Sequence, residues 1–160
     1  MIHDIATTLI TKLISHKMMI SCAESCTGGL IMAALTDVSG ASAAVDRGFV
    51  TYSNEAKMNL LGVQEETLSV YGAVSAETAY EMVIGALHES PHSLKAAISV
   101  TGIAGPNGGS EDKPVGTVWI GAAITDKEPV VKHYCFSGDR QEVRQKTTEA
   151  AIVQLLSLHD

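Results

Sequence analysis

A serine at position 25 lies where a short apolar run ends and a helical pattern begins. The run Met18–Ile20 is typical of a buried strand, and apolar residues recur at helical spacing from Leu30 to Val38. We therefore expect the residues between them to form a strand-to-helix turn. Such a turn presents the free backbone N–H groups of the helix start, which favour a negative charge. Ser25 is then either an ordinary helix cap or a nucleophile.

A lysine in a second turn of the same kind could activate that serine. We predict a strand over Gly48–Ser53 and a helix over residues 55–61, with Asn54 as the N-cap. Lys57 then lies at the third helical position, where the helix dipole disfavours a cation, and burial would lower its pKa further. A neutral lysine that hydrogen-bonds to Ser25 could accept its proton, as in Ser-Lys catalysis.

Two neighbours of Lys57 leave alternatives open. Tyr52 could hold or relay the serine proton, or it could be a strand residue with its hydroxyl at the rim. Ser53 is a rival nucleophile on spacing alone, or a turn or cap residue. Lys57 itself could be a solvated lysine on a surface helix.

The loop Gly102–Gly116 contains five of the 14 glycines of the chain. It follows the nearly continuous apolar run Lys95–Thr101, which is typical of a strand covered on both faces. A glycine-rich loop after a buried strand is a common ligand site. Its sequence matches neither the P-loop nor the dinucleotide-binding pattern. The loop therefore either binds a phosphate through its N–H groups or only turns a corner.

The remaining patterns predict an α/β fold with a mixed sheet, helices on both faces and one domain over residues 1–160. They comprise an amphipathic helix over Asp4–His16, a short helical piece over Glu65–Tyr71, a longer helix that begins at Ser75, a late antiparallel hairpin of Thr117–Thr125 and Val130–Phe136, and a last helix that begins at Asp139 with Glu142 completing a capping box.

Composition argues against several classes of partner. The net charge of -7 is opposite to that of a nucleic-acid surface, and the basic residues Arg140, Arg144 and Lys146 alternate with acidic ones, as on a solvated helix face. No apolar run approaches the roughly 20 residues that a membrane span requires. The first residues lack the features of a signal peptide, which predicts a cytoplasmic protein.

Cysteine and histidine spacing argues against a metal centre. Three cysteines cannot all pair, which fits a reducing compartment. Cys22 and Cys26 lack a second ligand pair, and the six histidines show no metal-binding spacing.

Longer blocks of the sequence resemble the CinA C-terminal domain family, the nicotinamide-nucleotide amidohydrolases of the PncC type. The blocks are Ala23–Gly29, Arg47–Lys57, Gly72–Ser75, Thr101–Pro106 with Gly108-Gly109, Lys113–Val118 and Phe136–Arg140. Together they cover nearly the whole chain, and they follow one another in the same order as in the family. The resemblance implies an α/β/α sandwich with a mixed, mainly parallel sheet, and a homodimer. Many relatives carry an additional N-terminal domain, which we do not expect here, nor any phosphohydrolase activity tied to it.

The resemblance also implies a reaction, the hydrolysis of nicotinamide mononucleotide to nicotinic acid mononucleotide and ammonia in pyridine nucleotide recycling. It implies no metal and no cofactor, with Ser25 as nucleophile, Lys57 as base and Tyr52 as an assisting residue. The 5′-phosphate needs N–H groups or a cation, and we expect substrate contacts from Thr27, Gly28, Gly29, Thr101, Gly102, Gly105, Gly108, Gly109 and Arg140. Two alternatives are a catalytically silent nucleotide-binding regulatory module and the hydrolysis of a different small amide.

Overall fold

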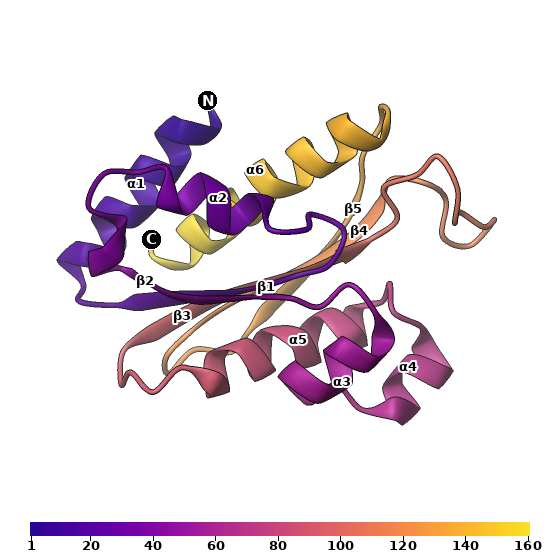
Figure 1. The fold of residues 1–160 in the computed structure, drawn as a ribbon, viewed down its shortest axis with the longest axis horizontal. Coiled ribbons are helices and arrows are strands. Elements are labelled where there is room, and N and C mark those ends of the chain that lie inside the picture. Colours follow the sequence, from indigo (N-terminus) through magenta and orange to yellow (C-terminus); the bar gives the residue numbers. More distant parts are fainter.

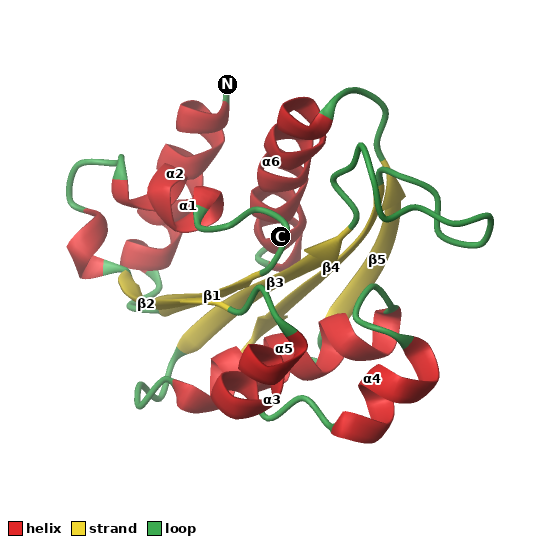
Figure 2. Cartoon of the chain, turned by 45° about the vertical axis from the view of Figure 1, so that its right-hand side comes forward, coloured by secondary structure: helices red, strands yellow, loops and turns green.

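Five strands form one sheet at the centre of the computed structural model, which describes residues 1–160 (Figures 1 and 2). The strands are β1 (Met19–Glu24), β2 (Val45–Val50), β3 (Lys95–Gly102), β4 (Thr117–Ile124) and β5 (Val130–Cys135), in the spatial order β2-β1-β3-β4-β5. β1 pairs in parallel with β2 and β3, whereas β4 is antiparallel to β3 and β5. Only β4 therefore runs against the other strands, and the mixed, mainly parallel sheet with a late hairpin is confirmed.

Helices cover both faces of this sheet, as expected for an α/β/α sandwich (Figure 1). One face carries α1 (Ile2–Ser15), α2 (Leu30–Thr36) and α6 (Arg140–Leu158), and the other carries α3 (Asn54–Leu61), α4 (Glu65–Tyr71) and α5 (Ala76–Glu89). A short 3₁₀ turn at Ala41–Ala43 leads into β2. No helix combines the length and the hydropathy needed to cross a lipid bilayer.

The two faces of the sheet have separate apolar cores. A cluster of 24 buried residues lies under α1, α2 and α6, and a cluster of nine lies under α3, α4 and α5. α5 approaches the second face closely, because a Cβ at Gly121 would lie 3.1 Å from the Ala79 carbonyl oxygen and 2.5 Å from Ser99 Oγ. Ser99 Oγ also donates to that carbonyl, at 2.7 Å. This contact fixes α5, and with it the segment 72–75 that precedes α5 at the carboxyl edge of the sheet.

The parallel strands bring three loops to the same edge. β1, β2 and β3 all end there, and Figure 1 shows the glycine-rich loop after β3 and the start of α6 at the same end of the molecule. Two strand boundaries differ from our predictions. β1 continues to Glu24. β2 runs from Val45 to Val50 and ends before Ser53, because Ser53 is the N-cap of α3.

Candidate active site

The turn after β1 consists of Ser25–Gly29, and Ser25 is its first residue. Its N–H donates to the Val100 carbonyl of β3 at 3.2 Å, which holds the start of the turn against the sheet. Gly29 precedes α2 with φ at +108°, a backbone conformation that favours glycine. The predicted strand-to-helix turn is thus confirmed, with a buried serine at its start.

The N–H groups at the start of α2 are already occupied, which corrects our expectation that they face a ligand. The carboxylate of buried Glu24 accepts from the N–H groups of Gly29, Ile31 and Met32 at 3.0–3.1 Å. It also accepts from the Thr27 hydroxyl at 2.6 Å. A carboxylate at the end of β1 is well placed to cap a helix N-terminus. The Thr27 side chain is consequently buried, with its hydroxyl bonded to Glu24.

Two N–H groups of the turn remain free. Those of Cys26 and Thr27 donate to no other residue, whereas the N–H of Gly28 donates to the Ser25 carbonyl at 3.0 Å. Successive free N–H groups form a small concavity that favours an anion. The turn therefore keeps two N–H donors in the two residues that directly follow Ser25.

α3 begins one residue earlier than predicted. Its N-cap is Ser53, whose Oγ accepts from the Ala56 N–H at 3.1 Å, and Asn54 is the first helical residue. Lys57 is therefore the fourth residue of the helix rather than the third, and Ser53 serves as a cap. A serine accepts the N–H two or three residues on as well as asparagine does, so the sequence alone did not separate the two candidates.

Lys57 is buried beside Ser25. Only 1% of the residue is exposed, so the solvated-lysine alternative is wrong. Its Nζ lies 3.1 Å from Ser25 Oγ and donates to the backbone carbonyls of Thr51 at 2.8 Å and Tyr52 at 3.3 Å. Ser25 and Lys57 are 32 residues apart in sequence. Adjacent parallel strands, β1 and β2, bring them together.

The surroundings of Lys57 favour its neutral form. Burial lowers the pKa of Lys57 below its ordinary 10.5, while the neighbouring Cys26 acts in the opposite direction. No carboxylate forms an ion pair with Lys57. A neutral amine can donate two N–H groups to the carbonyls of Thr51 and Tyr52 and accept the Ser25 hydroxyl proton on its lone pair. Burial, which we expected to act together with the helix dipole, is the largest cause of the lowered pKa.

The surroundings of Cys26 favour its neutral thiol. Burial raises the pKa of the Cys26 thiol to about 11, so at neutral pH it stays a thiol, which is a poor nucleophile.

The Tyr52 hydroxyl points to a different partner from the one we expected. The side chain is 62% exposed, and its oxygen accepts from Arg140 Nη2 at 3.1 Å. Only the backbone carbonyl of Tyr52 contacts Lys57. Arg140 Nη1 donates to the Gly105 carbonyl at 2.8 Å, so three of the predicted site residues form one connected group.

The predicted site residues at the end of β3 and in the loop that follows it have structural roles. Thr101 is buried and its hydroxyl donates to the Ala73 carbonyl at 2.7 Å, so its side chain supports the segment 72–75. A Cβ at Gly102 would lie 3.2 Å from Cys26 Sγ, so glycine allows the turn of Ser25 to pack closely. Farther along, Gly108 has φ at +92°, and a Cβ at Gly109 would lie 2.8 Å from the Val115 backbone nitrogen. These last two glycines shape the loop itself.

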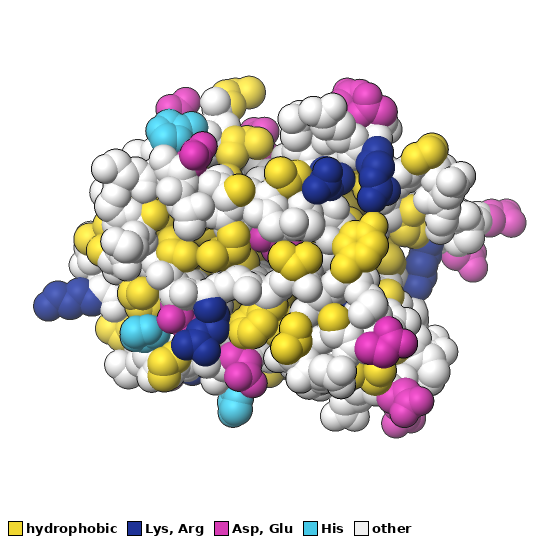
Figure 3. All heavy atoms as spheres, viewed as in Figure 1, with side chains coloured by type: hydrophobic (Ala, Val, Ile, Leu, Met, Phe, Trp, Pro, Cys, Tyr) yellow, Lys and Arg dark blue, Asp and Glu magenta, His cyan; other side chains and the backbone are white.

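Two residues that the sequence analysis gave no role hold the turn of Ser25. Besides Glu24, Arg144 of α6 donates through Nε to the Cys26 carbonyl at 3.0 Å and through Nη2 to the Thr27 carbonyl at 3.1 Å. A Cβ at Gly28 would lie 3.2 Å from Arg144 Nη2. Figure 3 shows basic side chains together with hydrophobic ones on the face where α6 begins. The expectation that Arg144 lies on a merely solvated helix face is therefore wrong; its spacing of four residues from Arg140 was the available signal.

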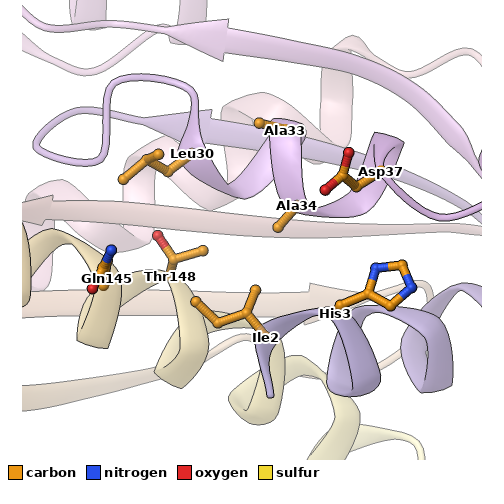
Figure 4. A pocket seen from close by; sticks show the side chains of 8 residues that line it. All are labelled: Ile2, His3, Leu30, Ala33, Ala34, Asp37, Gln145 and Thr148. Carbon is orange, nitrogen blue, oxygen red and sulfur yellow. The ribbon is translucent and has the colours of Figure 1, made fainter.

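A separate cavity of about 330 Å³ lies between α1, α2 and α6 (Figure 4). None of the predicted site residues lines it. Its lining residues are Ile2, His3, Leu30, Ala33, Ala34, Asp37, Gln145 and Thr148. The chain has no group of three or more His, Cys, Asp or Glu side chains placed to hold a metal ion.

The model of the CinA C-terminal domain matches residues 2–159. The chain belongs to the CinA C-terminal domain family. Among similar proteins of known name, nicotinamide-nucleotide amidohydrolase PncC of Enterobacter agglomerans is 50% identical over 96% of this chain and 91% of that protein. The protein of the same name from Escherichia coli strain K12 is 52% identical over 85% of this chain and 81% of that protein.

Solved structures of the CinA family share the fold. The competence/damage inducible protein CihA from Agrobacterium tumefaciens superposes with a TM-score of 0.96 at 45% identity, covering 99% of this chain and 96% of that one. The three-layer arrangement is therefore a property of the CinA family and not of this chain alone.

Proposed function

We propose that the protein hydrolyses the amide of nicotinamide mononucleotide to give nicotinic acid mononucleotide and ammonia. The observation that carries this proposal is the contact of buried Lys57 Nζ with Ser25 Oγ at 3.1 Å, with no acidic partner for the lysine. The names of relatives about half identical to this chain support the substrate.

The first step in the proposed reaction is attack by Ser25. Its Oγ bonds to the amide carbon while its proton passes to neutral Lys57 Nζ. The carbonyl oxygen becomes an oxyanion, and the free N–H groups of Cys26 and Thr27 are the donors available to stabilise it. Removing one such donor from other enzymes has lowered kcat by about 10²- to 10³-fold.

The second step releases ammonia. Protonated Lys57 gives its proton to the amide nitrogen, the carbon–nitrogen bond breaks, and a Ser25 ester remains. A water molecule then attacks this ester while Lys57 accepts one of its protons, and the departing Ser25 oxygen takes the proton back. The same buried amine serves as base and acid in both halves, which requires a pKa nearer to neutrality than that of an ordinary lysine.

Arg140 is the residue that we propose for the 5′-phosphate. Its guanidinium lies at the start of α6, and its contacts are the Tyr52 hydroxyl and the Gly105 carbonyl. A guanidinium binds phosphate through charge-assisted hydrogen bonds. In this assignment Tyr52 assists by holding Arg140 and lining the substrate site. The homodimer and the cytoplasmic location stay predictions from the family resemblance.

Ammonia release tests the proposed function. The purified protein should release ammonia from nicotinamide mononucleotide at the same rate with and without EDTA, because the proposed steps use only side chains and backbone groups of the chain. Nucleotide binding without turnover would favour the regulatory module instead, and loss of turnover in EDTA would show that a metal ion takes part.

Replacing Arg140 by alanine should separate phosphate recognition from chemistry. We expect KM for nicotinamide mononucleotide to rise about 10- to 100-fold, from the loss of charged hydrogen bonds worth roughly 1.5–3 kcal/mol. KM for unphosphorylated nicotinamide riboside should change much less. Lys146→Ala, which removes a charge from a half-buried position of the same helix, is the control. Equal effects of Arg140→Ala on both substrates would remove Arg140 from this role.

A further inference from the structure

The two peptide groups that carry the free N–H groups are held by different partners. The peptide between Ser25 and Cys26 is fixed within the turn, because the Ser25 carbonyl accepts from the Gly28 N–H. The peptide between Cys26 and Thr27 has no such internal partner. Its carbonyl, that of Cys26, accepts only from Arg144 Nε, at 3.0 Å.

The orientation of this second peptide decides where the Thr27 N–H points. In a trans peptide the N–H and the C=O point in opposite directions. Arg144 holds the Cys26 carbonyl toward α6, and the Thr27 N–H therefore points away from Arg144, where no group of the chain accepts it. Rotation of this peptide would replace the free donor by a carbonyl oxygen, which repels an oxyanion.

Apart from Arg144, no hydrogen bond holds the Cys26 carbonyl, whereas the next carbonyl, that of Thr27, also accepts from the Leu30 N–H at 3.1 Å. Gly28 follows with φ at +59° and has no Cβ, so the backbone beyond Thr27 is permissive. Glu24 fixes the turn through the Thr27 side chain and through N–H groups from Gly29 onward, but it does not contact the Cys26 carbonyl. Arg144 is also linked to the next carbonyl, that of Thr27, at 3.1 Å, so its guanidinium bridges two successive carbonyls.

We propose that Arg144 is a positioning residue that holds the peptide between Cys26 and Thr27 with the Thr27 N–H free to bind the oxyanion of the reaction. This inference rests on the proposed function. It gives the two arginines of α6 distinct tasks: Arg140 contacts Tyr52 and Gly105, whereas Arg144 contacts only the backbone of the turn.

Arg144→Met tests the role of Arg144, with Arg144→Lys as the conservative variant and Lys146→Met as the control for charge. Lys146 lies two residues away on α6 and reaches Ser137 instead of the turn. For nicotinamide mononucleotide we expect Arg144→Met to lower kcat about 10²-fold, in the range seen on loss of one oxyanion donor, with KM changed less than about twofold. Arg144→Lys should retain part of kcat, and added methylguanidinium should restore part of it in Arg144→Met. Lys146→Met should match the wild type.

A second probe separates failure of this inference from failure of the proposed function. An alkyl fluorophosphonate forms an oxygen–phosphorus bond to Ser25 while fluoride leaves and the serine proton passes to Lys57, and intact mass measures the rate. This probe passes through an anionic transition state whatever the natural substrate is. Arg144→Met should slow this labelling about as much as it lowers kcat. If the wild type is labelled but does not turn over the nucleotide, the proposed function fails and the labelling rates alone decide the role of Arg144.

The remaining outcomes overturn the inference. An increase in KM with unchanged kcat would make Arg144 a substrate ligand. Unchanged kcat and labelling would show that the turn holds its shape without Arg144. A drop in kcat that methylguanidinium does not restore, together with a lower melting temperature, would make the role of Arg144 structural. If the wild type neither reacts with the probe nor turns over the nucleotide, the inference falls with the proposed nucleophile.

Discussion

Ser25→Ala is expected to reduce kcat for ammonia release by about 10⁴-fold or more, a loss comparable to that seen when other serine hydrolases lose their nucleophile. The reason is that Ser25 Oγ is the only side-chain hydroxyl within hydrogen-bonding distance of Lys57 Nζ, at 3.1 Å. No other group can then take the acyl portion of the substrate. Binding of the nucleotide, measured by calorimetry, should persist in the variant because the expected phosphate contacts lie elsewhere.

Ser53→Ala is the matched control for this loss. Ser53 caps α3, so its replacement should lower the stability of the protein by roughly 1 kcal/mol, as the loss of an N-cap does. Turnover should stay near that of the wild type. The reverse result, with turnover intact in Ser25→Ala and lost in Ser53→Ala, would make Ser53 the nucleophile.

Lys57→Met is expected to lower kcat/KM by about 10²- to 10⁴-fold, the range for loss of a general acid–base group. Methionine has nearly the shape of lysine but no basic nitrogen, so the packing around it should be kept. In the wild type, kcat/KM should rise with pH as Lys57 loses its proton, with a midpoint below 10.5 because burial lowers the pKa of this group. That rising limb should be absent from the variant. A wild-type profile that rises only above pH 10.5 would contradict the assignment of Lys57 as base.

Although Lys57→Met should lose activity, it should not lose stability. The pKa of Lys57 is lower in the folded protein than in the unfolded chain, so between these two values the unfolded chain binds more protons. The stability of the wild type should therefore rise with pH through that window, and the full penalty of a buried ammonium applies below it. Lys57→Met lacks this penalty, so it should be at least as stable as the wild type at pH 7, with a gap that narrows as pH rises.

Urea unfolding at several pH values measures this difference. Lys132→Met, which removes an exposed lysine from β5, should show no such dependence. A large loss of stability in Lys57→Met at pH 7 would mean that the contacts of Lys57 stabilise the folded protein by more than the burial of its charge destabilises it.

The sequence was sufficient to predict the parts of the site that depend on strand order and turn chemistry. An apolar run followed by a helical pattern placed Ser25 at a strand end, and a second such pattern placed Lys57 early in a helix. Adjacent parallel strands then bring such turns together. The hairpin, the capping box at Asp139 and the cap at Ser75 were also predictable, because each depends on residues a few positions apart.

The sequence did not predict which polar groups satisfy one another across the fold. Glu24 appears in the sequence as one acidic residue beside a serine, yet it occupies the N–H groups of α2 that we expected to face a ligand. Tyr52 and Arg140 are 88 residues apart, and nothing local indicates that the hydroxyl would turn to Arg140 rather than Lys57. Such pairings depend on three-dimensional packing rather than on local spacing.

The proposed nucleophile and the proposed base come from one continuous stretch of the chain, β1 through α3, within residues 19–61. Arg140, Gly105 and the rest of the glycine-rich loop, by contrast, follow β3 in sequence. In the proposed function, the nucleophile–base pair and the phosphate contact are therefore encoded by separate segments that meet only in the folded protein. An exchange of residues 103–116, or a change at the start of α6, would leave the Ser25–Lys57 pair intact. Under the proposed function, recognition of the phosphate can therefore diverge among descendants of one gene while the proposed nucleophile and base are inherited unchanged.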